Sequence, residues 1–260
     1  VLAPGRYRGP WEIEVPGVRV DAEGAELAGP ADGSALVLAA PGIEVHGLRV
    51  RDAGRVADLY APDAAVWLVG CHGCRLERID TAGTPGGLRI EESRDVTVAS
   101  ARLAGAADGP GLTAYLADGL RVDATRLTGW LDGIYVERSD DVRIAGATVT
   151  GARRYGLHAM FGQGLEVVDT VVRAGGVGSA VMYGRDALLL RNRFEGHVGP
   201  LAYGLLLQEM AGAEVRDSDM VDNTVGVLVV SAPDVRLDGN EVRGSGTGLL
   251  VRRTPDAAAS

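Results

Sequence analysis

The stretch that decides the fold of this chain reads DGIYVERSDDVRIAGATVTGARRYGLHAM and spans residues 132–160. It contains a small residue followed by alternating apolar positions, Gly133-Ile134-Tyr135-Val136, and the phrase returns at Gly156-Leu157-His158-Ala159. Six further copies begin at Gly87, Gly111, Ser179, Gly204, Gly226 and Gly248. Successive starts lie 24, 22, 23, 23, 25, 22 and 22 residues apart. A period this regular indicates a repeat architecture.

A second phrase follows the first at a fixed offset, as in Val96-Thr97-Val98 and Leu120-Arg121-Val122. Its alternation of inward and outward residues is typical of a half-buried strand. Short strands separated by Gly, Asp and Asn turns make the rungs of a parallel β-solenoid, stacked about 4.8 Å apart. No helical pattern separates the strands, and the leucine-rich repeat consensus is missing. We therefore predict an all-β fold, a right-handed parallel β-helix of about ten or eleven rungs.

One domain is expected over residues 1–253, because the repeat runs without a linker. The tail 254–260 breaks the repeat and is predicted to be disordered. Within each rung the same inward slot should form one continuous ladder: Leu88, Leu112, Ile134, Leu157, Leu205, Val227 and Leu249. The same register assigns Met182 and Met220 to the interior.

Composition narrows the possible partners. Asp and Glu total 35 against 26 basic residues, giving a net charge of −9. Such a chain has no global attraction for nucleic acid or anionic lipid, so neither is predicted as a partner. No stretch of 18 apolar residues occurs, so we predict no membrane span. The opening residues Val1–Gly5 lack the features of a signal peptide, and we expect a chain whose leader has been removed.

The outward side of the first-phrase strand is unusually apolar and aromatic for a solvated face. Its predicted members are Trp67, Tyr115, Tyr135, Glu137, Val181, Tyr183, Leu206 and Gln208. An exposed apolar sheet with a few polar groups in its middle indicates a binding surface. The alternative is that loops from the rung edges fold over this sheet and bury it.

His158 and Met160 lie in the middle of that face, where alternation places them side by side. An imidazole and a thioether within about 7 Å are a plausible pair of ligands for copper. Met210 falls in the turn after a later strand and could reach the same face. The alternative is that His158 packs on Tyr135 and Met160 fills an apolar patch.

Cys71 and Cys74 form a single C-x-x-C pair. Two thiols are too few for a structural zinc site, and the sequence supplies no second pair. We therefore expect buried cysteines that serve as small apolar rung residues. Glu91 and Glu137 share one outward column about 9–10 Å apart, a separation used by inverting glycosidases. Glu209 lies on or beside the same apolar face, although scattered solvated carboxylates are the simpler interpretation.

Several blocks resemble the NosD family of periplasmic β-helix proteins that mature nitrous oxide reductase. The most specific block is Arg154-Tyr155-Gly156-Leu157-His158-Ala159-Met160, and others lie at 132–137, 181–185 and 203–207. The opening at 2–10 and the segment 40–48 are also similar to the family. The resemblance implies a periplasmic location, transient copper(I), and as partners an ABC-type permease and ATPase, a copper chaperone and nitrous oxide reductase. It places copper handling at His158 and Met160.

Two classes of function follow from the sequence. The first is a non-catalytic copper-delivery or scaffold protein, which the apolar outward face favours. The second is a carbohydrate-binding or carbohydrate-active β-helix protein such as a lyase, hydrolase or epimerase. A lyase would need calcium-binding Asp clusters and a Lys or Arg base, and the chain has neither lysine nor such a cluster.

Overall fold

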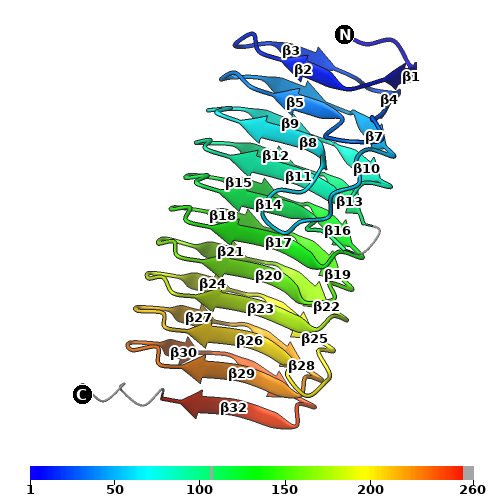
Figure 1. Ribbon diagram of the computed structural model, residues 1–260. Coiled ribbons are helices and arrows are strands. Elements are labelled where there is room, and N and C mark those ends of the chain that lie inside the picture. Colours follow the sequence, from blue (N-terminus) through cyan, green and yellow to red (C-terminus); the bar gives the residue numbers. More distant parts are fainter. Residues whose placement is uncertain (106–107, 254–260) are drawn as a thin grey trace, which may run out of the picture.

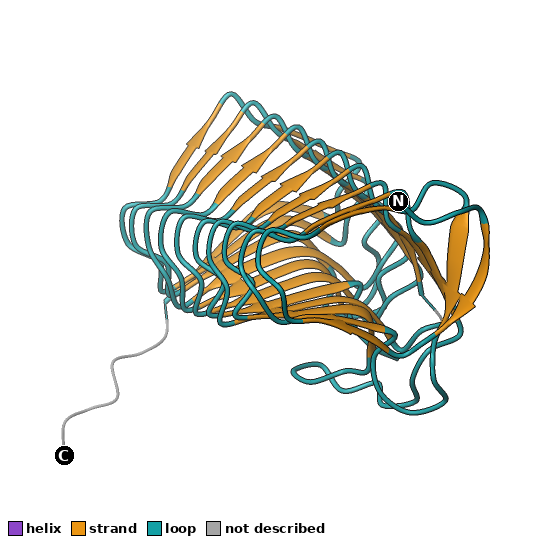
Figure 2. Cartoon of the chain, turned by 90° about the horizontal axis from the view of Figure 1, so that it is seen from above, coloured by secondary structure: helices purple, strands orange, loops and turns teal. Residues whose placement is uncertain are grey.

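Each rung contributes short strands to three parallel sheets that run the length of the molecule (Figure 1). The computed structural model describes residues 1–105 and 108–253. The predicted tail at 254–260 lies outside the described residues. Figure 2, a view along the solenoid, shows the sheets around a single interior. A parallel β-helix of about eleven rungs is therefore confirmed.

Sheet A has 11 strands. They are β1 (Gly5–Arg8), β4 (Ala25–Ala28), β7 (Arg49–Arg51), β10 (Asp80–Ala82), β13 (Arg102–Ala104), β16 (Arg126–Thr128), β19 (Thr148–Thr150), β22 (Val171–Arg173), β25 (Arg193–Glu195), β28 (Asp219–Val221) and β31 (Glu241–Arg243).

Sheet B, which carries the first phrase of the repeat, also has 11 strands. They are β2 (Trp11–Ile13), β5 (Leu36–Leu38), β8 (Ala64–Val69), β11 (Gly86–Glu91), β14 (Leu112–Tyr115), β17 (Asp132–Glu137), β20 (Tyr155–Met160), β23 (Val177–Met182), β26 (Tyr203–Gln208), β29 (Val225–Val230) and β32 (Thr247–Arg252).

Sheet C carries the second phrase and has 10 strands. They are β3 (Arg19–Asp21), β6 (Glu44–His46), β9 (Arg75–Glu77), β12 (Thr97–Ala99), β15 (Arg121–Asp123), β18 (Arg143–Ala145), β21 (Glu166–Val168), β24 (Leu188–Leu190), β27 (Glu214–Arg216) and β30 (Arg236–Asp238).

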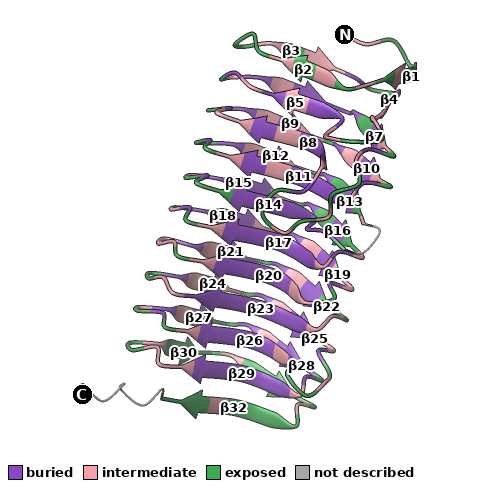
Figure 3. Ribbon diagram, in the orientation of Figure 1, coloured by how far each residue is buried: buried purple, intermediate pink, exposed green. Residues whose placement is uncertain are grey.

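The inward ladder of sheet B follows the predicted register. Leu112 pairs with Ile134, Ile134 with Leu157, and Leu205 with Val227. These side chains are almost fully buried, whereas Leu249 in the last described rung is 50% exposed because no described rung covers it. Figure 3 shows the same change from the buried middle strands to the exposed β32.

A column of glycines allows the rungs to stack closely at the start of the sheet B strands. A Cβ atom at Gly156 would lie 2.6 Å from the carbonyl oxygen of Gly178 and 2.0 Å from Val172 Cγ1. Gly133 and Gly204 face the next rung in the same way. Such approaches are shorter than van der Waals contact, so only glycine fits there. This is the physical reason for the small residue that opens each phrase.

Connections between the sheets differ in how much length they tolerate. From sheet B to sheet C the connections keep one length, as at 92–96, 116–120 and 161–165, and from sheet C to sheet A they are as short as 146–147. From sheet A to sheet B they vary, from 129–131 to the longer loops 52–63 and 196–202. Differences in rung length are therefore absorbed at one corner of the solenoid.

Candidate functional site

The outer face of sheet B carries two columns of side chains that alternation directs away from the interior. The first column is Trp67, Arg89, Thr113, Tyr135, His158, Ala180, Leu206, Leu228 and Leu250. The second column is Val69, Glu91, Tyr115, Glu137, Met160, Met182, Gln208, Val230 and Arg252. We call these two columns the outer face.

The structure corrects the predicted register in one rung. Ala159 pairs with Val181 and Met160 pairs with Met182, so Val181 points inward and Met182 lies on the outer face. The assignments of Val181 to the binding face and Met182 to the core were wrong by one residue. Tyr183 follows the strand, in a turn with φ of +57°.

The cause of this error is the choice of Ser179 as the start of the phrase. Gly178, one residue earlier, is the true member of the glycine column, because its Cβ position would meet the carbonyl oxygen of Gly204 at 2.2 Å. The extra length before Gly204 is taken up by the loop 196–202. In sheet C of the same rung, Leu189 is buried and Leu188 lies on the outward side.

Near the N-terminal end of the outer face, the polar side chains form hydrogen bonds and ion pairs with one another. The indole Nε1 of Trp67 donates to Glu91 at 3.0 Å, and the Arg89 guanidinium lies 4.5 Å from the centre of the Trp67 ring. Arg89 also pairs with Glu91 at 2.8 Å. Further along, the Tyr135 hydroxyl donates to Glu137 at 2.6 Å. Both carboxylates of the column are therefore engaged, and Tyr115, 37% exposed, lies between them.

The middle of the outer face is more buried than its alternation predicts. Tyr135 is only 2% exposed, because the ring of Tyr60 from the loop 52–63 packs edge-on against it with centroids 5.9 Å apart. Burial and the hydrogen bond to Glu137 raise the pKa of Tyr135 well above its ordinary value. At Tyr135 a loop therefore covers the sheet, which was the alternative to an exposed binding surface.

His158 is held by a buried carboxylate. Its Nδ1 lies 2.9 Å from Oδ2 of Asp132, and Asp132 also accepts two hydrogen bonds from Arg154 at 2.7 and 2.6 Å. Asp132 has no exposed surface, and His158 is 5% exposed between Tyr135 and Tyr155, whose ring centroids lie 4.9 and 4.4 Å away. Burial acts to raise the pKa of Asp132, but the hydrogen bonds from Arg154 and His158 outweigh it and hold that pKa below its ordinary value.

The ionised carboxylate keeps a proton on Nδ1 of His158 and so directs the lone pair of the neutral ring to Nε2. Within the described residues Nε2 is buried and has no hydrogen-bond partner. A histidine oriented in this way is chemically suited to accept a proton or a metal ion at Nε2. Asp132 was missed by the sequence reasoning, although it is a charged residue in a column otherwise occupied by Tyr155, Val177 and Tyr203.

Beyond His158 the outer face becomes apolar. Ala180, Leu206 and Leu228 are buried and form a cluster of their own with Met182 and Val225. Gln208 donates from Nε2 to the Tyr183 hydroxyl at 2.8 Å. This cluster is separate from the interior of the solenoid.

Three methionines approach one another at the edge of this cluster. Met160 and Met182 are neighbours across adjacent rungs, and Met210, 2% exposed, lies in the turn after β26. All three line a small cavity of about 20 Å³, together with Val136, Ser139, Val142, Ala159, Gly162, Leu165 and Val181. Met220 is fully buried elsewhere, as predicted. His158 does not line this cavity.

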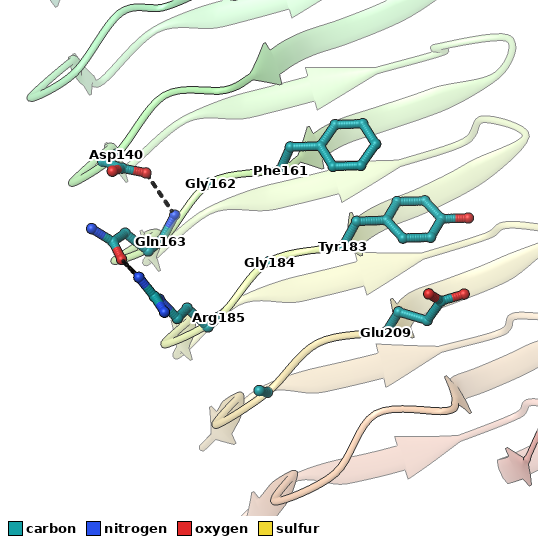
Figure 4. A pocket seen from close by; sticks show the side chains of 9 residues that line it. Asp140, Phe161, Gly162, Gln163, Tyr183, Gly184, Arg185 and Glu209 are labelled. Carbon is teal, nitrogen blue, oxygen red and sulfur yellow. Dashed lines mark hydrogen bonds between the residues drawn. The ribbon is translucent and has the colours of Figure 1, made fainter.

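A groove of about 650 Å³ runs outside this cavity, and its lining residues come from four successive rungs (Figure 4). One wall carries Phe161 and Tyr183, whose stacked rings have centroids 5.2 Å apart, followed by Glu209. On the other side Arg185 donates two hydrogen bonds to the side-chain oxygen of Gln163, at 2.8 and 2.6 Å.

Cys71 and Cys74 are joined in a disulfide, a linkage that the prediction of two separate small apolar residues did not include. Both are buried, as expected. Among the described residues, no group of three or more His, Cys, Asp or Glu side chains could hold a metal ion.

Residues 102–256 match the model of a family described as periplasmic copper-binding protein (NosD). The chain belongs to the NosD family. The "Probable ABC transporter binding protein NosD" of Pseudomonas aeruginosa is 37% identical over 106 residues, 40% of this chain and 24% of that protein. The match thus spans about a quarter of that NosD relative. None of the described residues lies in a helix long and apolar enough to cross a bilayer.

Solved structures share the fold of this NosD-family chain. The A-module of the mannuronan C-5 epimerase AlgE4 of Azotobacter vinelandii has a TM-score of 0.55 at 12% identity, with 96% of this chain and 90% of that chain covered. PfbA, a surface adhesin of Streptococcus pneumoniae, has a TM-score of 0.60 at 8% identity, with coverage of 94% and 72%. At such identities the likeness shows the fold alone.

Proposed function

We propose that this chain is a non-catalytic, periplasmic copper-delivery or scaffold protein that acts with an ABC-type transporter in the maturation of nitrous oxide reductase. A copper chaperone would supply copper(I), and the enzyme would receive it. Membership of a family described as periplasmic and copper-binding supports the copper role. The printed name of the Pseudomonas aeruginosa relative supports a transporter partner.

The single observation that carries the proposal is the set of soft donors on the outer face and in the turn beside it. His158, with its lone pair directed to Nε2, occupies the column next to Met160, and Met210 lies close to Met160 around one cavity. Imidazole and thioether are ligands that suit monovalent copper. A carrier must also release its cargo, which an open site of two or three ligands permits better than a closed tetrahedral cage.

A catalytic role has less support from the outer face. The predicted carboxylate pair, Glu91 and Glu137, is occupied by hydrogen bonds from Trp67 and Tyr135. A hydrolase of the two-carboxylate type would use one of these groups to protonate the leaving group and the other to activate water. Carbohydrate binding remains the second candidate because the groove in Figure 4 carries the stacked pair Phe161 and Tyr183.

The proposal is tested with variants that preserve the surrounding contacts. In His158→Asn the side-chain amide can still donate to Asp132 while the lone pair at Nε2 is lost, and Met160→Leu conserves side-chain volume. The double variant should lose copper(I) binding in a competition titration against a chromophoric chelator. In cells it should impair the maturation of nitrous oxide reductase.

Val230→Ala, in the same column as Met160, is the matched control and should retain both properties. Full copper affinity and full maturation in the double variant would show that the site is wrongly assigned. Turnover of an acidic polysaccharide by the wild-type chain would replace the copper proposal with the carbohydrate one.

A further inference from the structure

Three of the four methionines in the chain line one small cavity. They come from three successive rungs, Met160 at the end of β20, Met182 at the end of β23 and Met210 just after β26. The pairing of Met160 with Met182 places the first two side by side on the same face. Because the three residues are 22 and 28 positions apart in the sequence, only the folded solenoid brings them together.

Met210 occupies a turn position that is glycine in the two preceding rungs. In those rungs Gly162 and Gly184 have no room for a side chain, since a Cβ on either would lie within 2.4 Å of a carbonyl oxygen of the rung before. The Met210 side chain reaches back toward the preceding rung, where its Sδ accepts a hydrogen bond from the Gly184 N–H at 3.1 Å. A thioether sulfur is a weak acceptor with two lone pairs, so one remains for another partner.

The charge and the donor atoms of the residues that line the cavity determine which kind of ion it can hold. None of its residues carries a formal charge, and apart from the thioethers its only side-chain heteroatom is the hydroxyl of Ser139. Burying a divalent ion without an anionic ligand is costly, and hard cations require oxygen ligands. Neutral thioethers favour soft monovalent ions such as copper(I) and silver(I).

The space and the burial fit one small ion. A volume of about 20 Å³ slightly exceeds the roughly 10–15 Å³ needed to hold one water molecule. Met210 is 2% exposed and Met182 is 8% exposed, whereas Met160 is partly exposed on the outer face. Gly162 lines both this cavity and the groove of Figure 4, so the two lie next to each other.

We propose that Met160, Met182 and Met210 form a three-thioether site that binds one soft monovalent metal ion. This inference rests on the proposed copper function and deepens it, because it adds Met182 to Met160 and Met210 as a ligand and places the ion in the cavity that these three residues line, away from His158. Selectivity then follows from the absence of charged ligands around the cavity. Binding of the ion forms three metal–sulfur contacts without release of protons, since thioethers carry none.

The experiment uses the whole chain labelled with carbon-13 at the methionine methyl groups, which gives one signal for each of four methionines. Silver(I) serves as a redox-inert probe, and copper(I) is added under reducing conditions. At one equivalent of either ion the methyl signals of Met160, Met182 and Met210 should shift, while that of Met220 should stay in place. The signals are assigned from single Met→Leu variants, and zinc(II) should move none of them.

The same variants measure the affinity. Met182→Leu and Met210→Leu should each weaken silver(I) binding by at least about tenfold, since even loss of an outer-shell partner weakens metal sites by roughly that factor. Met220→Leu is the matched control, being a buried methionine of the same chain outside the cavity. Its affinity should equal that of the wild type. Thermal melts verify that each variant remains folded.

The possible results distinguish failure of the three-thioether site from failure of the proposed copper function. If copper(I) binds but the three methyl signals do not move, the three-thioether site is wrong and the copper function stands. If the signals move and yet the Met182→Leu and Met210→Leu variants support full reductase maturation, the site stands and its role in delivery is wrong. If the wild type binds neither ion, both proposals fail.

Discussion

The carboxylate of Asp132 is hydrogen-bonded to the imidazole of His158 on the outer face, with 2.9 Å between Oδ2 and Nδ1. The carboxylate is fully buried and also forms an ion pair with Arg154. A surface imidazole would rotate freely, whereas this ring is fixed in orientation and enclosed by Tyr135 and Tyr155. The outer face therefore contains a preorganised polar centre within an apolar and aromatic surround.

Replacing Asp132 with Asn should make folding less stable and less sensitive to acid. Because the pKa of Asp132 is lower in the folded chain than in the unfolded chain, its ionisation stabilises the fold above about pH 4. That stability is lost as the pH falls through the folded-state pKa. Asp132→Asn should cost about 1.5–3 kcal/mol at pH 7, the range for hydrogen bonds to charged groups.

Urea unfolding at pH 7 and near pH 3 measures this difference, which should shrink at the lower pH. Asp169→Asn is the matched control because Asp169 also pairs with an arginine, Arg191, but at the exposed surface. It should leave the unfolding midpoint nearly unchanged at pH 7. Equal destabilisation by the two substitutions would contradict a special role for the buried carboxylate.

Ile134→Asp should prevent folding. Ile134 is 1% exposed in the inward ladder between Leu112 and Leu157, and an unpaired charge there costs several kcal/mol, comparable with the stability of a whole domain. Circular dichroism and solubility report the result. Thr97→Asp, on the outward side of β12 between Arg75 and Arg121, should fold normally. A soluble Ile134→Asp variant with wild-type melting would refute the register.

Alanine should be tolerated in the glycine column at Gly248, which no described rung covers, and should destabilise the chain at Gly156. Gly156→Ala places a methyl group 2.0 Å from Val172 Cγ1 and should destabilise the chain by about 1–3 kcal/mol, as overpacking does. At Gly248, in the last described rung, the nearest atom to a new Cβ is 3.9 Å away. Gly248→Ala should therefore change stability little, and thermal melts of the two variants should differ clearly.

Loss of the Cys71–Cys74 disulfide should weaken the fold and leave copper binding intact. Closing so short a loop stabilises the chain by about 2 kcal/mol in the chain-entropy model. The double variant Cys71→Ala and Cys74→Ala should therefore unfold at lower urea, and reductant should shift the wild type in the same direction. A copper(I) titration should not distinguish the variant from the wild type. Metal that vanishes with the two cysteines would overturn this expectation.

The repeat revealed most of the fold because strand periodicity and the glycine column are local properties of the sequence. The ladder from Leu88 to Val227 follows directly from alternation. The rung that begins at Gly178 was misplaced, because Gly178 and Ser179 are both small and the rung contains additional loop residues. A single wrong start then reversed Val181 and Met182.

The site was predicted less completely, because its contacts join residues from different rungs. His158, Met160 and Gln208 lie on the outer face as alternation indicated. The cover provided by Tyr60 and the carboxylate of Asp132 depends on tertiary contacts, which periodicity does not encode. The disulfide likewise required the distance between the two cysteines in the folded turn.

The corner between sheets A and B accepts loops of different length, while the strands alone maintain the stack of rungs. The loops 52–63 and 196–202 differ from their counterparts in length, yet the strands on either side of them keep the common register. Such a scaffold can exchange one recognition loop for another while the ladder beneath stays unchanged. Natural variation among homologous β-helices should therefore concentrate at this corner, where new partners can be acquired at little cost to folding.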